Sequence, residues 1–264
     1  MKNRNVLVAF LIMCLGCDLC FAQQEKFHYP AGLTITRFFP ELTTPLYGMV
    51  YDDTWPARMS ISLPENYRPD KQYPLFLWIN GGHGGPGGNL RIPKTVTENT
   101  DYICANFPLF KETLAPVSED GRNFWGRMAI GHREQEILWK SYQVMLERVY
   151  QSVPNIDREK SVLGGFSNGA HTTSVLLDTQ DMIRKYFSRF VLIEGGGRLQ
   201  HLEKLQGHSI LIVRGGDSRG SEPLVGLHQR LANEGVDAEF KVMEGVGHEF
   251  PDEHFDVLRT WLSR

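Results

Sequence analysis

Short apolar stretches alternate with helical periodicity along the chain from about Ala57 onward. Several of these stretches are continuously apolar, as strands buried on both faces of a sheet are. We therefore expect an α/β fold, with a mostly parallel central sheet and helices on both faces. The pattern predicts strands at Met59–Leu63, Leu75–Ile79, Tyr102–Phe107, Ser161–Phe166, Phe190–Glu194, Ile210–Arg214 and Ala238–Met243.

Apolar residues at helical spacing predict the helices between these strands. One stripe ends at Pro154, which cannot continue a helix. A second stripe ends at Gly235, a favourable C-terminal cap, and residues 23 to about 56 are expected to form a leading strand or hairpin. The stripes are Leu138, Tyr142, Met145, Leu146, Val149 and Val153; Leu224, Leu227 and Leu231; and Phe255, Leu258, Trp261 and Leu262.

The first 22 residues are typical of a cleaved signal peptide. Lys2 and Arg4 precede a short apolar run, and Cys20-Phe21-Ala22 offers small residues at a cleavage site. The run is shorter than the roughly 20 residues that a membrane-spanning helix needs, so we expect no stable membrane span. The sequence thus predicts a secreted or periplasmic protein, and a lipoprotein anchor at Cys17 is the alternative.

Composition and charge narrow the function classes. Residues 23–264 have the length of one α/β domain, and 41% of the whole chain is hydrophobic. Loss of the signal's two basic and one acidic residues would change the formal net charge from −3 to −4. This mild acidity, without a basic cluster, argues against a nucleic-acid partner. Cys14, Cys17 and Cys20 lie inside the signal, so the mature chain would keep only Cys104.

The run GFSNG places Ser167 between a predicted strand and the helix expected over Asn168–Leu177. A serine presented on such a tight turn needs neighbours without bulk, and the pattern G-x-S-x-G supplies them. The turn also points the backbone N–H of Asn168 toward a reacting carbonyl group. The motif predicts that Ser167 is a nucleophile; a glycine-rich turn with a helix-capping serine is the alternative.

A second glycine-rich segment, NGGHGGPGG, follows the strand that ends at Ile79. In an acyl-transfer enzyme such a loop supplies a second oxyanion donor from a backbone N–H, for which Gly81 and Gly82 are the candidates. The segment also matches a dinucleotide fingerprint from Gly82 to Gly87, which would indicate a redox enzyme. Pro86 and Pro93 disturb the helix that this fingerprint requires.

A nucleophilic serine needs a base and a carboxylate that orients the base, in the chain order Ser, Asp or Glu, His. His248 follows the last predicted strand between small residues and is the expected base. Asp217 follows the strand before it and is the preferred carboxylate. Glu194, at the end of an earlier strand, is the second candidate for this role.

The other histidines and two aromatic residues have weaker interpretations. A metal site at His248, Asp252, Glu253 and His254 is not expected, since the zinc-protease pattern requires histidine at position 252. His171 and His83 are candidates for lining the pocket. Phe124 and Trp125 lie in a segment that we expect to pass over the pocket and to hold the acyl or alcohol group, with core packing as the alternative.

Taken together, these motifs resemble the α/β-hydrolase family, and within it the secreted esterases and the prolyl oligopeptidase-like hydrolases. The resemblance rests on LPENYRPDKQYPLFLWINGG, NIDREKSVLGGFSNGA, RGGD and GVGHEF, in that order, between about Ala57 and Trp261. One departure is Asn80-Gly81-Gly82, where related esterases often have His-Gly-Gly.

This resemblance implies a serine esterase with no cofactor, acting on a small-molecule or polymer-linked ester. The implied triad is Ser167, Asp217 and His248, and the implied oxyanion donors are Asn168 and Gly82. A peptidase-like serine hydrolase and a non-catalytic binder on the same fold are the alternatives. The sequence does not distinguish acetyl, feruloyl, lipid or peptide substrates.

Overall fold

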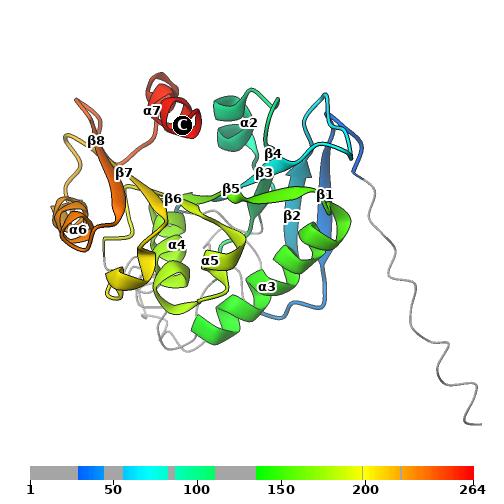
Figure 1. Ribbon diagram of the computed structural model, residues 1–264, viewed down its shortest axis with the longest axis horizontal. Coiled ribbons are helices and arrows are strands. Elements are labelled where there is room, and N and C mark those ends of the chain that lie inside the picture. Colours follow the sequence, from blue (N-terminus) through cyan, green and yellow to red (C-terminus); the bar gives the residue numbers. More distant parts are fainter. Residues whose placement is uncertain (1–28, 45–55, 83–86, 111–134, 198, 221) are drawn as a thin grey trace, which may run out of the picture.

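The computed structural model describes residues 29–44, 56–82, 87–110, 135–197, 199–220 and 222–264. In this part of the chain one twisted sheet runs across the molecule with helices above and below it, as Figure 1 shows. The predicted signal at residues 1–22 lies outside the described residues. Within the described residues no helix is both long and apolar enough to cross a bilayer.

The central sheet has eight strands in the order β1-β2-β4-β3-β5-β6-β7-β8. The antiparallel pairs are β1 with β2 and β2 with β4, and every other neighbouring pair is parallel. The predicted mostly parallel sheet is therefore confirmed. The strands are β1 (Thr34–Phe39), β2 (Ala57–Ser62), β3 (Tyr73–Ile79), β4 (Ile103–Phe107), β5 (Ile156–Phe166), β6 (Arg189–Ile193), β7 (Ser209–Gly215) and β8 (Asp237–Met243).

Helices cover both faces of this sheet, as predicted. The α2 and α7 helices lie above the sheet in Figure 1, and α3, α4 and α5 lie below it. Short 3₁₀ turns, η2 (Leu202–Leu205) and η3 (Asp252–His254), complete the described elements. The helices are α2 (Arg91–Thr97), α3 (Gln135–Ser152), α4 (Asn168–Thr179), α5 (Ile183–Tyr186), α6 (Glu222–Asn233) and α7 (Phe255–Leu262).

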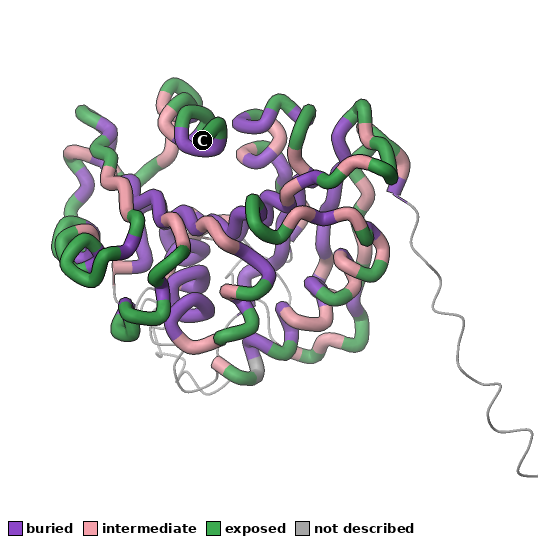
Figure 2. The backbone as a smooth tube through the Cα atoms, viewed as in Figure 1, coloured by how far each residue is buried: buried purple, intermediate pink, exposed green. Residues whose placement is uncertain are grey.

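Two apolar cores form because inner strands such as β4 and β6 are buried on both of their faces (Figure 2). Side chains alternate across a strand, so successive residues of β5 and β6 enter opposite cores. Leu163 and Leu192 pack with α3, α4 and α6, and Val162 and Val191 pack with α7. The side chains that face these strands come from the three helical stripes predicted from the sequence. Every residue of the stripes is buried, including Leu146, Leu227 and Trp261.

The direction of the strands decides where a functional site can lie. In the parallel strands β3 to β8, the carboxyl ends meet at one edge of the sheet. The loops after β3, β5, β6, β7 and β8 therefore converge there. These loops, with the first residue of α4, carry the predicted nucleophile, base, carboxylate and oxyanion residues.

Candidate active site

Ser167 occupies a strained turn between the last residue of β5 and the first residue of α4. Its backbone has φ 52° and ψ −117°, a conformation that a non-glycine residue adopts rarely. A Cβ placed on Gly165 would lie 2.3 Å from the carbonyl carbon of Gly169, and one on Gly169 would lie 2.0 Å from the oxygen of Ile79. The flanking glycines are required for this turn, as the motif predicts.

The imidazole of His248 reaches Ser167 from the loop after β8. Its Nε2 atom lies 2.8 Å from Oγ of Ser167, a distance at which the ring can take the hydroxyl proton. The ring also packs against Phe166, with 5.3 Å between the two ring centres. The structure thus brings together the predicted nucleophile and the predicted base.

Glu194, rather than Asp217, lies against this histidine. The Oε2 atom of Glu194 accepts a hydrogen bond from Nδ1 of His248 at 2.8 Å. Asp217 is exposed, and its backbone N–H bonds to the carbonyl oxygen of Val246. The preference for Asp217 is therefore wrong, and the second candidate of the sequence holds the position.

The reason lies in the turn after β6. Glu194 has φ 55°, which turns the chain sharply directly after the strand. Its own N–H bonds to the carbonyl oxygen of Val213 in β7, so the residue lies close to the neighbouring strand. The glutamate side chain, one methylene longer than aspartate, covers the remaining distance to the histidine, which comes from the far side of β7.

The carboxylate of Glu194 is held by three donors. Oε1 accepts a hydrogen bond from the N–H of Gly215 at 2.6 Å, and Oε2 accepts one from the Ser218 hydroxyl in addition to His248. Burial raises the pKa of Glu194, but these hydrogen bonds outweigh burial and bring the net pKa below its usual value. Glu194 therefore stays ionised and keeps the Nδ1–H tautomer of His248.

The sequence did not indicate the contact between Ser218 and the carboxylate of Glu194. Ser218 directly follows Asp217, and the small polar residue after RGGD is the one signal that could have indicated the contact. In the structure Ser218 is buried while Asp217 is exposed. The RGGD segment thus serves the site through its backbone and this serine, and not through its carboxylate.

Two of the three predicted oxyanion residues, Asn168 and Gly81, border Ser167. Asn168 is the first residue of α4, and a Cβ placed on Gly81 would lie 2.8 Å from Cβ of Ser167. Gly82 follows with φ 56°, a conformation that favours glycine. This placement is compatible with backbone donors on both sides of Oγ, and their role in binding an oxyanion stays a prediction.

The α4 helix also holds the segment that follows Glu194. Nδ1 of His171, one turn after Ser167, accepts a hydrogen bond from the N–H of Gly196 at 3.1 Å. A Cβ on Gly195 would lie 2.5 Å from the carbonyl oxygen of Ser167, so this segment packs directly on the nucleophile turn. His171 thus has a structural contact that the sequence did not indicate, and its predicted place in a substrate pocket stays a prediction.

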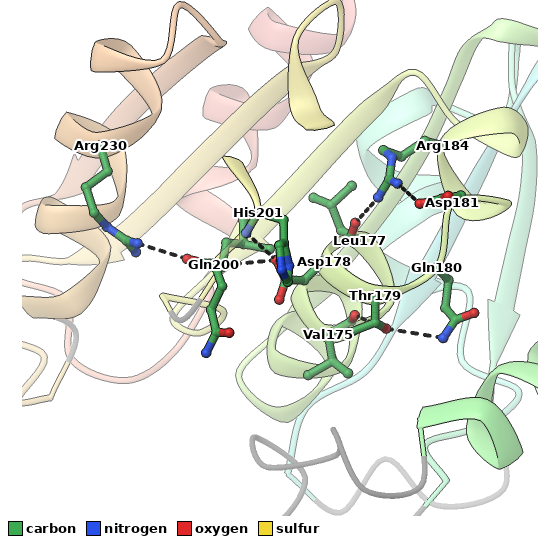
Figure 3. A network of polar contacts seen from close by, with 11 residues as sticks. Val175, Leu177, Asp178, Thr179, Gln180, Asp181, Arg184, Gln200, His201 and Arg230 are labelled. Atoms are coloured by element: carbon green, nitrogen blue, oxygen red, sulfur yellow. Dashed lines mark hydrogen bonds and ion pairs between the residues drawn. The ribbon is translucent and has the colours of Figure 1, made fainter. Parts of the chain in front are cut away.

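Figure 3 shows how the same segment continues toward η2. Oδ1 of the buried Asp178, near the end of α4, accepts the N–H groups of Gln200 and His201 at 2.9 and 2.8 Å. From the other side, Arg230 of α6 donates to the carbonyl oxygen of Leu199 at 2.9 Å. Residues 199–201, which precede η2, are therefore fixed to two helices.

Three of the candidate residues cannot be placed. Phe124, Trp125 and His83 lie outside the described residues, so their predicted roles in a pocket are untested. Within the described ranges, no group of three or more histidine, cysteine or acidic side chains is arranged to hold a metal ion.

The fold has counterparts among solved structures. A fluorophosphonate-binding serine hydrolase of Staphylococcus aureus superposes with a TM-score of 0.59 at 12% identity, over 89% of this chain and 99% of that chain. A ferulic acid esterase of Anaeromyces mucronatus gives 0.56 at 17% identity, over 91% and 92% of the two chains. This chain has the α/β-hydrolase fold. At these identities the likeness concerns the fold alone.

Sequence comparisons link this α/β-hydrolase chain to peptidases. The protein named "Probable dipeptidyl-aminopeptidase B" of Penicillium rubens is 25% identical over 144 residues. That match covers 52% of this chain and 15% of the fungal protein. A protein of Schizosaccharomyces pombe named "Putative dipeptidyl aminopeptidase" matches at 26% identity over 45% of this chain and 15% of its own length. A scan against models of known protein families gives no match.

Proposed function

We propose that this α/β-hydrolase is a serine hydrolase, and most specifically a carboxylic ester hydrolase. The observation that carries the proposal is the continuous chain of hydrogen bonds from Ser167 through His248 to Glu194, each contact to the imidazole being 2.8 Å long. This arrangement is what a serine needs to become a nucleophile. Three loops that are far apart in the sequence meet to form it.

The proposed reaction has two steps. Nε2 of His248 takes the proton of Ser167 while Oγ attacks the carbonyl carbon of the ester, and Glu194 stabilises the imidazolium that forms. His248 then gives the proton to the leaving alcohol, which leaves an acyl-enzyme. A water molecule, activated by the same imidazole, attacks the acyl carbon, and Ser167 leaves with its proton restored.

The negative oxygen of each tetrahedral intermediate needs fixed donors. We assign this role to the backbone N–H of Asn168, which directly follows Ser167, and to that of Gly82 or Gly81, of which Gly81 packs against Ser167. Backbone donors cost no reorganisation when the charge develops, and one such donor typically contributes about 10²- to 10³-fold in turnover.

Ester and peptide hydrolysis share this acyl-transfer chemistry, so the triad alone does not choose between them. Esterases among the structural counterparts support the ester reading, while the dipeptidyl aminopeptidases among the relatives support a peptidase as the second candidate. A panel of chromogenic esters of increasing acyl length, run beside chromogenic dipeptide amides, separates the two and ranks the acyl groups.

The alternative hypothesis, a dinucleotide-dependent oxidoreductase, has less support. A dinucleotide fingerprint needs a helix that begins in the glycine loop, so that its N-terminus meets the pyrophosphate. The helix after this loop, α2, begins only at Arg91, and its N-cap residue is Leu90, without a side-chain cap. The organised triad beside the loop instead favours hydrolysis.

We further propose that the protein is exported, with residues 1–22 as the signal. The support is the basic start, the short apolar run and the small residues before position 23. Determination of the N-terminus of the mature protein tests this: cleavage after Ala22 is expected, and a start at a lipidated Cys17 would favour the anchored form.

Ser167→Ala tests the proposed chemistry. If the triad acts as a unit, kcat for a chromogenic ester falls by about 10⁶-fold. Ser263→Ala is a matched control, because Ser263 is exposed beyond the end of α7 and bonds only locally to the carbonyl oxygen of Thr260. Unchanged hydrolysis by a folded Ser167→Ala variant would contradict the proposal.

A further inference from the structure

An amide side chain is buried in the apolar strand β4, next to the glycine-rich segment 80–88, here called the glycine loop. Asn106 is fully buried, and it pairs with Trp78 of β3 in the parallel register. A buried amide without partners destabilises a protein, so the contacts of this side chain need a full account.

Every polar atom of the Asn106 side chain is hydrogen-bonded to backbone of β3 or of the loop that follows it. Nδ2 donates to the carbonyl oxygen of Trp78 at 2.9 Å. Oδ1 accepts the N–H groups of Gly88 and Asn89 at 2.6 and 3.1 Å. Trp78 precedes the glycine loop and Gly88 ends it, so one side chain ties the two ends of the loop together.

At Gly87, near the C-terminal end of the glycine loop, the backbone packs closely against β2. Gly87 has φ 89°, and a Cβ placed there would lie 2.4 Å from the carbonyl oxygen of Arg58 in β2. The Nε atom of Arg58 donates to the carbonyl oxygen of Gly87 at 2.7 Å. Asn106 and Arg58 thus hold successive residues at the point where the loop leaves the sheet.

The near end of the loop touches the nucleophile. A Cβ on Gly81 would lie 2.5 Å from the carbonyl oxygen of Phe166 and 2.8 Å from Cβ of Ser167. Glycine-rich backbone has more conformational freedom to lose than any other, so a loop of this composition keeps its donors in place only if its ends are fixed. A small shift at an oxyanion donor costs much of its effect, because the donor must meet the developing charge.

We propose that Asn106 is a positioning residue of the hydrolase: by tying both ends of the glycine loop, its side chain sets where the oxyanion donors of Gly81 and Gly82 stand relative to Ser167. This inference rests on the proposed function. Asn106 is fully buried, so its effect passes through the loop. Replacement therefore acts on the transition state more than on substrate binding.

The test compares Asn106→Leu with Asn155→Leu. Asn155 also joins backbone segments through its amide, with Nδ2 donating to the carbonyl oxygens of Arg68 and Lys71. It directly precedes β5, at the end of the strand opposite Ser167. Ile156 pairs with Tyr73 and Gly165 with Ile79, and six steps along β3 at about 3.3 Å per residue separate the two ends by about 20 Å. It serves as the control for a lost amide staple that lies away from the site.

For Asn106→Leu, kcat for p-nitrophenyl acetate is expected to fall by about 10²-fold, as when one oxyanion donor is lost, while KM changes by less than about threefold. Asn106→Asp keeps the acceptor for Gly88 and Asn89 but replaces the amide donor to Trp78 by a buried carboxyl group, so it should retain about ten times more kcat than the leucine variant while staying below wild type. Asn155→Leu should lower the thermal midpoint without lowering kcat.

A kcat within about threefold of wild type in Asn106→Leu overturns the inference, as does a rise in KM that accounts for the whole loss. If the leucine variant does not fold, Asn106→Asp decides: a kcat equal to that of wild type contradicts the proposal, and a reduced kcat with unchanged KM supports it. Failure of the proposed function is seen separately, as wild-type turnover that does not depend on Ser167.

Discussion

Nδ1 of His248 lies 2.8 Å from Oε2 of Glu194, although Glu194 follows β6 and His248 follows β8. The carboxylate thus passes the intervening strand β7 to reach the base. That strand contributes the N–H of Gly215, which bonds to the other oxygen of the same carboxylate at 2.6 Å. The acid is therefore supported by the strand that it passes.

This contact predicts that Glu194→Gln and Asp217→Asn have different effects. The amide of glutamine cannot hold His248 as a carboxylate does, so kcat for ester hydrolysis should fall by about 10⁴-fold, as when a triad acid is neutralised. Asp217 is exposed, and its asparagine variant should stay within about twofold of wild type. Steady-state kinetics of both variants check this. The reverse order would restore Asp217 as the triad acid.

Glu194 should also make stability depend on pH. Its pKa is lowered in the folded protein from an ordinary value of 4.5, because the hydrogen bonds from His248, Ser218 and Gly215 favour the ionised form more than burial disfavours it. The ionised group then stabilises the fold fully above its unfolded pKa, and this contribution is lost as the pH falls through the folded pKa.

Urea unfolding of wild type and Glu194→Gln from pH 7 to pH 3 isolates this contribution. The difference in the free energy of unfolding between the two proteins should be constant above about pH 5 and should then shrink as the pH falls. A difference that is independent of pH throughout this range would mean that Glu194 has the same pKa in the folded and unfolded states.

Gly81→Ala should abolish the proposed ester hydrolysis, because the added methyl group has no space beside Phe166 and Ser167. Either the glycine loop or the nucleophile turn must move, so kcat should fall by at least about 10²-fold. Gly226→Ala is the matched control: it lies in α6, where a Cβ meets nothing within 4 Å, and alanine there should stabilise the helix by about 0.5–1 kcal/mol. Equal activity of both variants would contradict the tight packing at Gly81.

The sequence was sufficient to predict those strands and helices that show a clear pattern of buried apolar residues. Apolar runs identify β3, β4, β6 and β7, and the confirmed stripes identify α3 and α7. By contrast, β5 begins at Ile156, five residues before the predicted start. The prediction missed its first part because that part carries exposed charged residues, which are not typical of a buried strand.

The α2 helix was missed for a related reason. It spans only Arg91–Thr97, carries Pro93 in its first turn and ends at Glu98 and Asn99 with positive φ, so its sequence resembles a loop. Its buried residues pack in the core next to α7, a contact that no local pattern shows. Tertiary packing stabilises this helix rather than its propensity.

The active-site acid could not be chosen from the sequence, because both candidates satisfy the chain order of the triad. Glu194 and Asp217 each follow a strand at the same edge of the sheet, and turn geometry decides between them. The left-handed conformation of Glu194 and the buried Ser218 are properties of the folded backbone. Asn106 is different: an amide inside the run ICANF was visible, but its partners were not.

The central claim is that Ser167 is an activated nucleophile. The most direct measurement is to treat the full-length protein with a fluorophosphonate probe and to locate the modified residue by mass spectrometry. Only a serine with an organised base reacts readily with such a probe. Modification is expected at Ser167 in wild type and not in Ser167→Ala, with strongly slowed labelling in Glu194→Gln. Modification of a different serine, or labelling that persists in folded Ser167→Ala, would contradict the claim.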